Sequence, residues 1–129
     1  MNIKHIDLVG IPAPDQNASL AFYTEKLGFE VRLNIPHMED PSIRWIQLAL
    51  PGSSTTVVLA PWVKPEQFIT FVLETNNIEA DYAELQSKGL NLQPLVTQPW
   101  GISTPIIDPA GNELLLQQST ELPKSVPEK

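Results

Sequence analysis

The chain has 129 residues, of which 42% are hydrophobic and 18% charged, a composition typical of one globular domain and not of a disordered chain. The formal net charge of −7 argues against a nucleic-acid-binding protein, and the lack of cysteine excludes thiol chemistry, disulfides and thiolate metal sites. No apolar run reaches the roughly 18 residues of a membrane span. We therefore expect a cytoplasmic protein that contacts neither nucleic acid nor membrane.

The first half of the chain predicts a strand, a helix and three further strands. Residues 3–11 alternate loosely between apolar and polar, which indicates a strand. Residues 17–28 carry apolar side chains at helical spacing, with Asp15 before them as a candidate N-cap and Gly28 at the C-terminal cap position. The strands that follow are expected at residues 29–35, 43–50 and 55–62.

The second half of the chain repeats this order. Residues 68–75 predict a strand, and the next segment predicts a helix that ends at Gly89. The remaining strands are expected at residues 90–96, 102–107 and 112–118. We interpret the sequence as one domain over residues 1–120, made of two βαβββ modules at about residues 1–62 and 66–120. Residues 121–129 contain two prolines and no apolar pattern, so they are expected to be a frayed tail.

The last predicted strand indicates which of its two faces would be packed against other parts of the protein. The segment DPAGNELLL begins as a type I turn, with proline at its second position and glycine at its fourth. Three leucines in a row follow, so both faces of the strand are expected to be covered. We expect Leu114 and Leu116 to pack on a helix, and Leu115 to face a trough. The predicted fold is α+β: an open, barrel-like trough of eight strands with the helices outside.

Three segments carry a resemblance to a known family. They are DQNASLAFYTEKLGFEV, TNNIEADYAELQSKGLNL and DPAGNELLL, in this order along the chain. Together they resemble the vicinal oxygen chelate superfamily, which contains glyoxalase I, bleomycin-resistance proteins, fosfomycin-resistance enzymes and extradiol dioxygenases. The resemblance covers roughly residues 3–118. It implies the paired-module fold and assembly as a homodimer.

The resemblance also places the positions at which metal-dependent members hold their ion. Those ligands typically come from the first, fourth, fifth and eighth strands. Counting from the nearest landmarks gives Leu8, then Val58 or Leu59, then Thr70 and Leu115. Divalent ions in such sites require imidazole nitrogens and carboxylate oxygens, which none of these side chains offers. The resemblance therefore implies no metal ion, no other cofactor, and no standard metal-dependent glyoxalase I activity.

A shifted ligand set has few candidates. Glu113 shares its strand face with Leu115, which makes it a candidate for the rim of the trough. The two histidines are interpreted as an edge residue, His5, and a loop residue, His37. Asp7 is the carboxylate most expected to be buried. Metal ions need several convergent donors, and this set does not supply them.

Without a metal ion the trough is expected to be a pocket with apolar walls. Leu8 and Leu115 would form a dry floor together with Leu59, and three tryptophans are the expected aromatic lining: Trp45, Trp62 and Trp100. Trp62 and Trp100 each lie beside a proline near a strand end, where rim residues are expected. The alternative for each tryptophan is a place in the core or in a subunit interface.

Two classes of function follow from these expectations. The first is a metal-independent protein of the bleomycin-resistance type that binds a small aromatic or amphipathic molecule. The second is a divergent lyase, isomerase or dioxygenase-like enzyme with a non-standard site. A dimeric scaffold without a pocket is the third interpretation.

Overall fold

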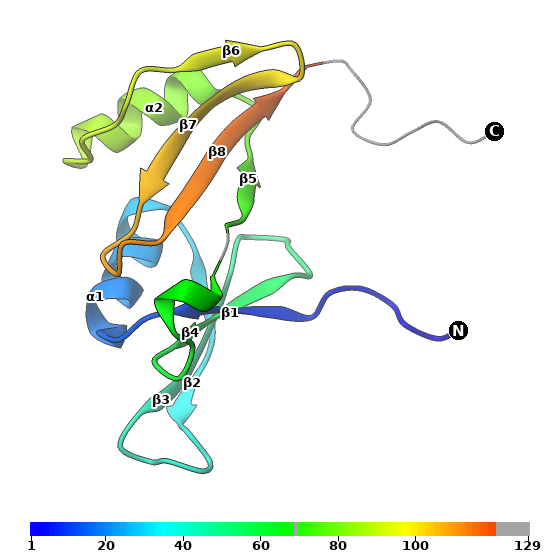
Figure 1. The fold of residues 1–129 in the computed structure, drawn as a ribbon, viewed down its shortest axis with the longest axis vertical. Helices are drawn as coiled ribbons and strands as arrows, with labels where there is room; N and C mark the ends of the chain where they lie inside the picture. The colour runs from blue at the N-terminus through cyan, green and yellow to red at the C-terminus, as the bar shows by residue number, and fades with distance from the viewer. Residues whose placement is uncertain (69, 121–129) are drawn as a thin grey trace. The chain divides into compact units, whose positions relative to one another are not determined.

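The computed structural model describes residues 1–68 and 70–120, so the tail predicted at residues 121–129 lies outside the described residues. The chain forms two compact units, each built on one four-stranded sheet (Figure 1). Of the described residues, the first unit takes 1–68 and 108–112, and the second takes the others. Strand, helix and three strands follow one another twice, which confirms an α+β fold of two βαβββ modules. No helix in the described ranges is long and apolar enough to cross a lipid bilayer.

The strands of the first sheet are ordered β1-β4-β3-β2, with β1 parallel to β4 and the other pairs antiparallel. The elements of this module are β1 (Leu8–Pro12), α1 (Gln16–Ala21), β2 (Glu30–Pro36), β3 (Arg44–Ala49) and β4 (Thr56–Ala60). The first strand begins at Leu8 and not at residue 3, because its partner β4 begins at Thr56, directly opposite Leu8. A strand extends only as far as a neighbour can accept its hydrogen bonds.

The caps predicted for the first helix are confirmed. The Asp15 carboxylate accepts a hydrogen bond of 3.1 Å from the amide of Ala18, and the helix continues after α1 as a π-helical segment, Phe22–Lys26. Gly28 then has a φ of +77°, a left-handed conformation that glycine adopts without steric cost. This cap lets the chain turn back into β2.

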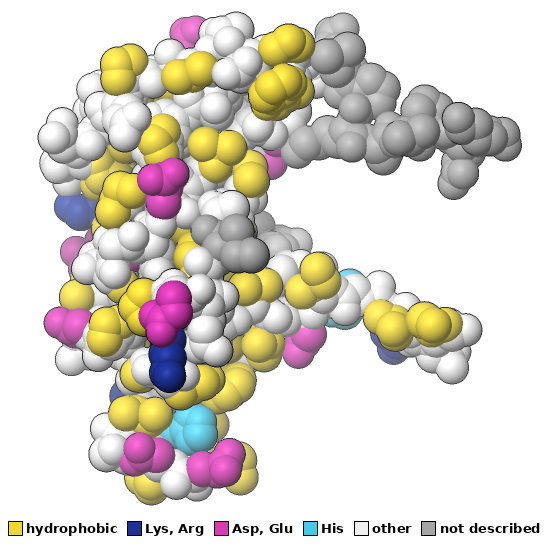
Figure 2. Space-filling model, in the orientation of Figure 1, with side chains coloured by type: hydrophobic (Ala, Val, Ile, Leu, Met, Phe, Trp, Pro, Cys, Tyr) yellow, Lys and Arg dark blue, Asp and Glu magenta, His cyan; other side chains and the backbone are white. Residues whose placement is uncertain are grey.

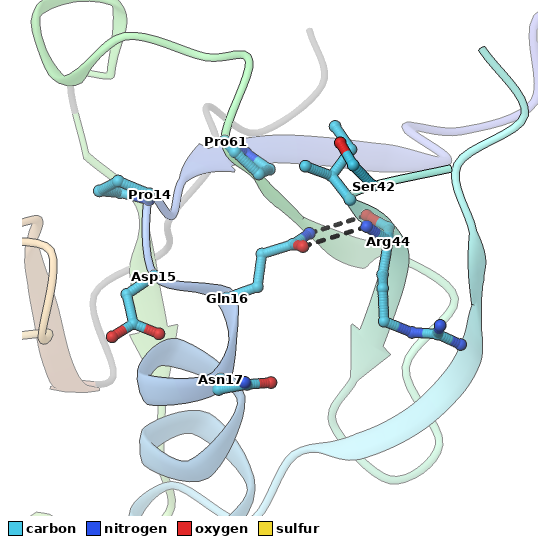
Figure 3. A pocket seen from close by; sticks show the side chains of 8 residues that line it. Pro14, Asp15, Gln16, Asn17, Ser42, Arg44 and Pro61 are labelled. Carbon is cyan, nitrogen blue, oxygen red and sulfur yellow. Dashed lines mark hydrogen bonds between the residues drawn. The ribbon is translucent and has the colours of Figure 1, made fainter. Parts of the chain in front are cut away.

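One face of the first sheet packs against α1 and forms the core of the unit. Its side chains are at most 8% exposed and are Ile11, Ile46, Leu48, Val57 and Leu59. Gln16 joins the helix to the sheet: its amide nitrogen donates to the carbonyls of Arg44 and Leu59, at 2.7 and 2.9 Å. Its amide oxygen accepts from the Arg44 backbone N–H at 3.1 Å (Figure 3). The helix is therefore fixed on the sheet by packing and by an amide clamp.

The second sheet has the equivalent order, β5-β8-β7-β6. The elements of this module are β5 (Val72–Glu74), α2 (Ile78–Ser87), β6 (Val96–Gln98), β7 (Gly101–Ile107) and β8 (Glu113–Ser119). Strand β6 begins later than predicted, because the carbonyl of Gln93 is taken by the hydroxyls of Tyr82 and Thr104 at 2.9 and 3.0 Å. At Gln93 the backbone is therefore bonded to side chains and not to a neighbouring strand.

Strand β8 shows which face of the second sheet is covered. Leu114 and Leu116 are buried, and the side-chain oxygen of Gln118, on the same face by strand alternation, accepts from the first amide of α2 at 2.8 Å. Leu115 lies on the opposite face and is half-buried. The helix therefore packs where the run of leucines predicted it.

The turn between β7 and β8 is part of the first unit, and its carboxylate is buried there. Asp108 is 4% exposed, and one of its oxygens accepts from the Tyr23 hydroxyl and the Asn112 side-chain amide, both at 2.7 Å. Its other oxygen accepts from the backbone amides of Ala110 and Asn112, both at 2.9 Å. The prediction that Asp7 is the buried carboxylate is wrong, because Asp7 is exposed. A carboxylate is stable without water only where several donors replace the water.

We expect the stability of the protein to fall at alkaline pH through Tyr23. Burial, and secondarily the Asp108 carboxylate, raise the pKa of Tyr23 above its ordinary value of 10.0. Above about pH 10 the phenol therefore ionises in the unfolded chain but not in the folded one, which favours unfolding by about 1.4 kcal/mol per pH unit. Below about pH 10 the phenol is neutral in both states, so the contribution of Tyr23 to the free energy of unfolding is fully present.

The test compares urea unfolding of the wild type and Tyr23→Phe between pH 8 and pH 11. Tyr23→Phe should be less stable at pH 8, by about 1–2 kcal/mol, because Asp108 loses a donor. The difference between the two proteins should shrink as the pH rises above 10. A difference that is constant over this range would contradict the assignment.

Candidate functional site

The register of the first sheet defines its second face, which points away from α1. Leu33 lies opposite Gln47, Ile35 opposite Trp45, and Gln47 opposite Val58. Because side chains alternate along a strand, all of these share one face. We call it the second face, and its larger side chains include Leu8, Leu33, Ile35, Trp45, Gln47, Thr56 and Val58.

Strand β2 exposes apolar side chains along the edge of this sheet. All seven of its residues are exposed, and Val31, Leu33 and Ile35 are each 40% exposed or more. Leu33 and Ile35 are exposed together on the second face, next to the loop that joins β2 to β3, whereas the register shift after Val31 places Val31 opposite Leu48 on the other face.

Three aromatic side chains meet where β2 and β3 approach this loop. The rings of Trp45 and Trp62 are stacked, with centroids 5.7 Å apart and planes inclined by 16°. His37 places its ring against Trp62, with centroids 4.9 Å apart at 65°, and 6.1 Å from Trp45. We call these three residues the aromatic cluster. Trp62 is still 43% exposed, so part of its surface is free to contact a ligand.

A chain of hydrogen bonds fixes the orientation of the Trp45 indole. Its N–H donates to the side-chain oxygen of Gln47 at 3.0 Å, and the Gln47 amide donates to the Thr56 hydroxyl at 2.8 Å. That hydroxyl donates to the backbone carbonyl of Asp7 at 3.0 Å. Each donor in the chain has an acceptor, so the indole is held in one orientation before any ligand arrives.

His37 is held by the loop that follows it. Its backbone N–H donates to the carbonyl of Ile43 at 3.0 Å, and its ring atom Nδ1 accepts from the amides of Glu39 and Asp40, at 3.1 and 3.3 Å. Hydrogen bonds from the Ser42 hydroxyl and amide lower the pKa of Asp40, so this side chain is a carboxylate at neutral pH. The loop therefore has its own network of hydrogen bonds.

A pocket of about 350 Å³ lies beside the aromatic cluster, a volume within the range of small-molecule sites. Its lining residues are Leu33, Ile35, Pro36, His37, Met38, Glu39 and Trp45. Figure 2 shows hydrophobic, acidic and histidine side chains gathered over the β2–β3 connection, at the bottom of the view. Apolar walls with few polar groups suit a molecule that is mostly apolar.

A second pocket of about 420 Å³ lies at the start of α1 (Figure 3). It is lined in part by Gln16 and Arg44. The side chain of Gln16 is fully used in the clamp described above. The Arg44 guanidinium donates to the side-chain oxygen and the backbone carbonyl of Asn34, at 2.5 and 3.0 Å. The side chain of Gln16 and two of the five guanidinium N–H groups of Arg44 are therefore used within the protein.

The site residues predicted in the first module do not all lie on the same face of its sheet. Leu8 is half-buried on the second face, and Trp45 and Trp62 meet in the aromatic cluster. Leu59 is fully buried on the face that packs against α1. Val58, the alternative for that strand, lies on the second face in its place.

The other predicted residues belong to the second unit. Leu115 is half-buried opposite Val72, and the Thr70 hydroxyl donates to the backbone carbonyl of Glu113 at 2.9 Å. Trp100 is 57% exposed at the turn between β6 and β7. A role in ligand binding stays a prediction for Leu115, Thr70, Glu113 and Trp100. The trough common to the two modules also stays a prediction.

The described residues of the two units offer few groups of side chains that could coordinate a metal ion. Within residues 1–68 and 70–120, no three His, Cys, Asp or Glu side chains lie close enough together to hold an ion. The positions derived from the resemblance carry alkyl groups at Leu8, Val58 and Leu115. The hydroxyl of Thr70 is the only polar group among them, and one hydroxyl does not form a divalent-ion site.

Sequence reasoning missed His37 as a member of the site. The antiparallel pairing of β2 with β3 places Ile35 opposite Trp45 and Pro36 opposite Arg44. The residue after Pro36 must therefore lie close to Trp45. Counting cross-strand pairs outward from the segment PHMEDPS could have found this neighbourhood.

Comparison with known proteins finds relatives over most of the chain. A sequence model of the Glyoxalase/Bleomycin resistance protein/Dioxygenase superfamily matches residues 3–116. The crystal structure of TnmS3, an antibiotic binding protein from Streptomyces sp. CB03234, is 32% identical in sequence and has a TM-score of 0.85. The alignment with TnmS3 covers 93% of this chain and 99% of that one.

Two further relatives are similar over most of their length. A glyoxalase/bleomycin resistance protein from the same Streptomyces strain is 31% identical, with a TM-score of 0.75, over 88% of this chain and 100% of that one. The uncharacterized protein YetH of Bacillus subtilis (strain 168) is 27% identical over 121 residues, which is 90% of this chain and 99% of YetH.

Proposed function

This chain belongs to the Glyoxalase/Bleomycin resistance protein/Dioxygenase superfamily, and we propose that it is a metal-independent member that binds a small planar aromatic or amphipathic molecule. The observation that carries the proposal is the aromatic cluster beside an apolar pocket of about 350 Å³. TnmS3, at 32% identity, is an antibiotic binding protein, which supports a binding function over a catalytic one.

The geometry of the cluster favours a planar ligand. Trp45 and Trp62 are already stacked, and the hydrogen bonds to Gln47 hold the Trp45 ring in place. A flat ring that contacts the exposed part of Trp62 would extend the stack and bury apolar surface on both partners. Because the tryptophans are ordered in advance, little side-chain entropy would be lost on binding.

Independence of a metal ion is supported by the side chains at the positions where metal-dependent relatives hold their ligands. Leu8, Val58 and Leu115 have no lone pairs to donate. We propose that Leu8 and Leu115, which are half-buried, contribute dry apolar surface, each by less than the about 1.5–3 kcal/mol of a fully exposed side chain, whereas Val58 is 1% exposed and has almost no surface left for a ligand to cover. Elemental analysis of protein purified without chelators should find less than stoichiometric zinc, nickel, manganese or iron.

We also propose a homodimer, as the family resemblance implies. Leu33 and Ile35 on β2 are exposed apolar side chains against which a second copy could pack, beside the pocket that they line. Sequestration of the bound molecule is the function that we propose for this pocket.

Binding is tested by equilibrium titration of a library of planar aromatic compounds, followed by tryptophan fluorescence. We expect at least one compound to bind in the low micromolar range or tighter. Trp62→Ala should weaken its binding about tenfold, because the stacking surface is lost. No compound that binds more tightly than high micromolar, or an unchanged affinity in Trp62→Ala, would contradict the proposal.

The matched variant is Trp100→Ala, which removes another exposed tryptophan, from the second unit. If the site is confined to the aromatic cluster, its affinity equals that of the wild type. A loss equal to that of Trp62→Ala would support the prediction, made from the sequence, that Trp100 lines the rim.

A further inference from the structure

We infer that the molecule bound beside the aromatic cluster carries an uncharged hydrogen-bond acceptor, a carbonyl oxygen, on the edge of its ring, and that His37 Nε2 donates to it. The inference rests on the proposed function and specifies the chemical class of ligand for the same pocket. It comes from the hydrogen bonds of His37 and from the composition of the lining.

The two ring nitrogens of His37 have different partners. Nδ1 accepts from the backbone amides of Glu39 and Asp40, so it carries no hydrogen in this arrangement. The neutral imidazole therefore carries its hydrogen on Nε2. Nε2 makes no hydrogen bond to any other residue that the structure describes, and no described buried side-chain nitrogen or oxygen lacks a partner. The Nε2–H group is therefore an unused donor that solvent can reach.

Among the side chains that line the pocket, this group is the one available donor. Leu33, Ile35, Pro36 and Met38 have no N–H or O–H group in their side chains, and the indole N–H of Trp45 is taken by Gln47. Glu39 is an acceptor when ionised, so it does not compete for the ligand's acceptor.

Glu39 also selects against one kind of acceptor. A ligand carboxylate or sulfonate in this pocket would be repelled by the carboxylate of Glu39, which is one of the lining residues. A neutral carbonyl oxygen avoids this repulsion and still accepts from Nε2. The pocket chemistry therefore favours ketones, lactones, amides and quinones attached to flat rings over aromatic acids.

The position of the donor relative to the stack supports the same conclusion. The His37 ring packs against Trp62, 4.9 Å between centroids, and its orientation is fixed by the two amides at Nδ1. A donor held beside a stacking surface recognises an oxygen at the edge of a ring that uses this surface. The tryptophans provide affinity for flat rings in general, and His37 discriminates among them.

The test uses two ligands of the same shape, 9-fluorenone and fluorene, which differ by a carbonyl group in place of a methylene. Binding is measured by equilibrium dialysis with trace ligand and excess protein. The wild type should bind fluorenone about five- to tenfold more tightly than fluorene, the effect of one neutral hydrogen bond. The comparison needs no variant, so it does not depend on how a substitution folds.

Two variants assign the preference to His37. In His37→Asn the amide oxygen can take the place of Nδ1 and keep accepting the loop amides, while the donor at Nε2 is lost. Both ligands should bind more weakly, because the imidazole ring that lines the pocket is lost, but fluorenone should lose more, so that its preference over fluorene falls to about one. His37→Gln places an amide N–H near the position of Nε2, and it should restore a preference of about twofold or more.

Equal wild-type affinity for the two ligands, or a full preference in His37→Asn, would overturn the inference and leave the proposed function standing. Failure of both ligands to bind even at millimolar protein would count against the aromatic pocket itself, and the inference would fall with it. Tighter binding of fluorene-2-carboxylate than of fluorenone would overturn the selection by Glu39.

Discussion

Replacing Asp108 with alanine is expected to lower the free energy of unfolding by about 3–5 kcal/mol. The substitution removes the acceptor of four hydrogen bonds and leaves the Tyr23 hydroxyl, the Asn112 amide group and two backbone amides without it. The site is 4% exposed, so water does not readily replace the carboxylate. Because small domains are stable by only about 5–15 kcal/mol, a large part of the total would be lost.

The measurement is urea unfolding at pH 7, followed by circular dichroism. Asp7→Ala is the matched control, because its carboxyl is exposed and makes no hydrogen bond within the described chain. It should change the stability by less than about 0.5 kcal/mol. Equal effects of the two substitutions would show that the Asp108 network contributes nothing beyond loss of a charge.

The second large effect is expected for Leu59→Ala, at about 2–5 kcal/mol of lost stability. Leu59 is fully buried on the face that packs against α1, so its truncation leaves a cavity between helix and sheet. The affinity for an aromatic ligand should stay within about twofold of the wild type. This outcome separates a core position from a position in the site.

Leu8→Ala serves as the counterpart, because Leu8 lies on the second face and is half-buried. Its loss of stability should be smaller than that of Leu59→Ala, since less apolar surface is uncovered. Thermal unfolding and ligand titration of the same two variants provide both quantities. A Leu59→Ala protein that is as stable as the wild type but has lost its ligand would place Leu59 in the pocket after all.

The order of the elements could be predicted from the sequence because the local signals agree. Asp15 and Gly28 mark the ends of the first helix, and Gly89 the end of the second, by chemistry that involves few distant partners. The run from Leu114 to Leu116 predicted a strand covered on its helix face, and Leu114 is fully buried there. Local periodicity and caps are sufficient for such features.

Strand beginnings and sheet faces depend on pairing partners, which no local pattern contains. Strand β1 begins at Leu8 because β4 begins at Thr56, a relation across 48 residues. A shift of one residue in the assumed register moves a side chain to the other face of the sheet. This is why Leu59 and Val58 could not be distinguished by counting.

The buried carboxylate and the histidine of the pocket were missed for a related reason. The environment of Asp108 is created by Tyr23, 85 residues away in sequence, and that of His37 by Trp45 on β3 and by Trp62 in the turn after β4. In the sequence both residues look like ordinary members of turns. Long-range contacts determine their surroundings, and composition alone does not reveal them.

The buried network around Asp108 has a consequence for how the chain could be divided. The first unit contains the pentapeptide 108–112, which arrives only after most of the second module has been synthesised. A ribosome that has released only the first 68 residues has therefore not yet made the acceptor for the Tyr23 hydroxyl. The amino-terminal unit is therefore completed late in synthesis, by a segment that is encoded within the second module.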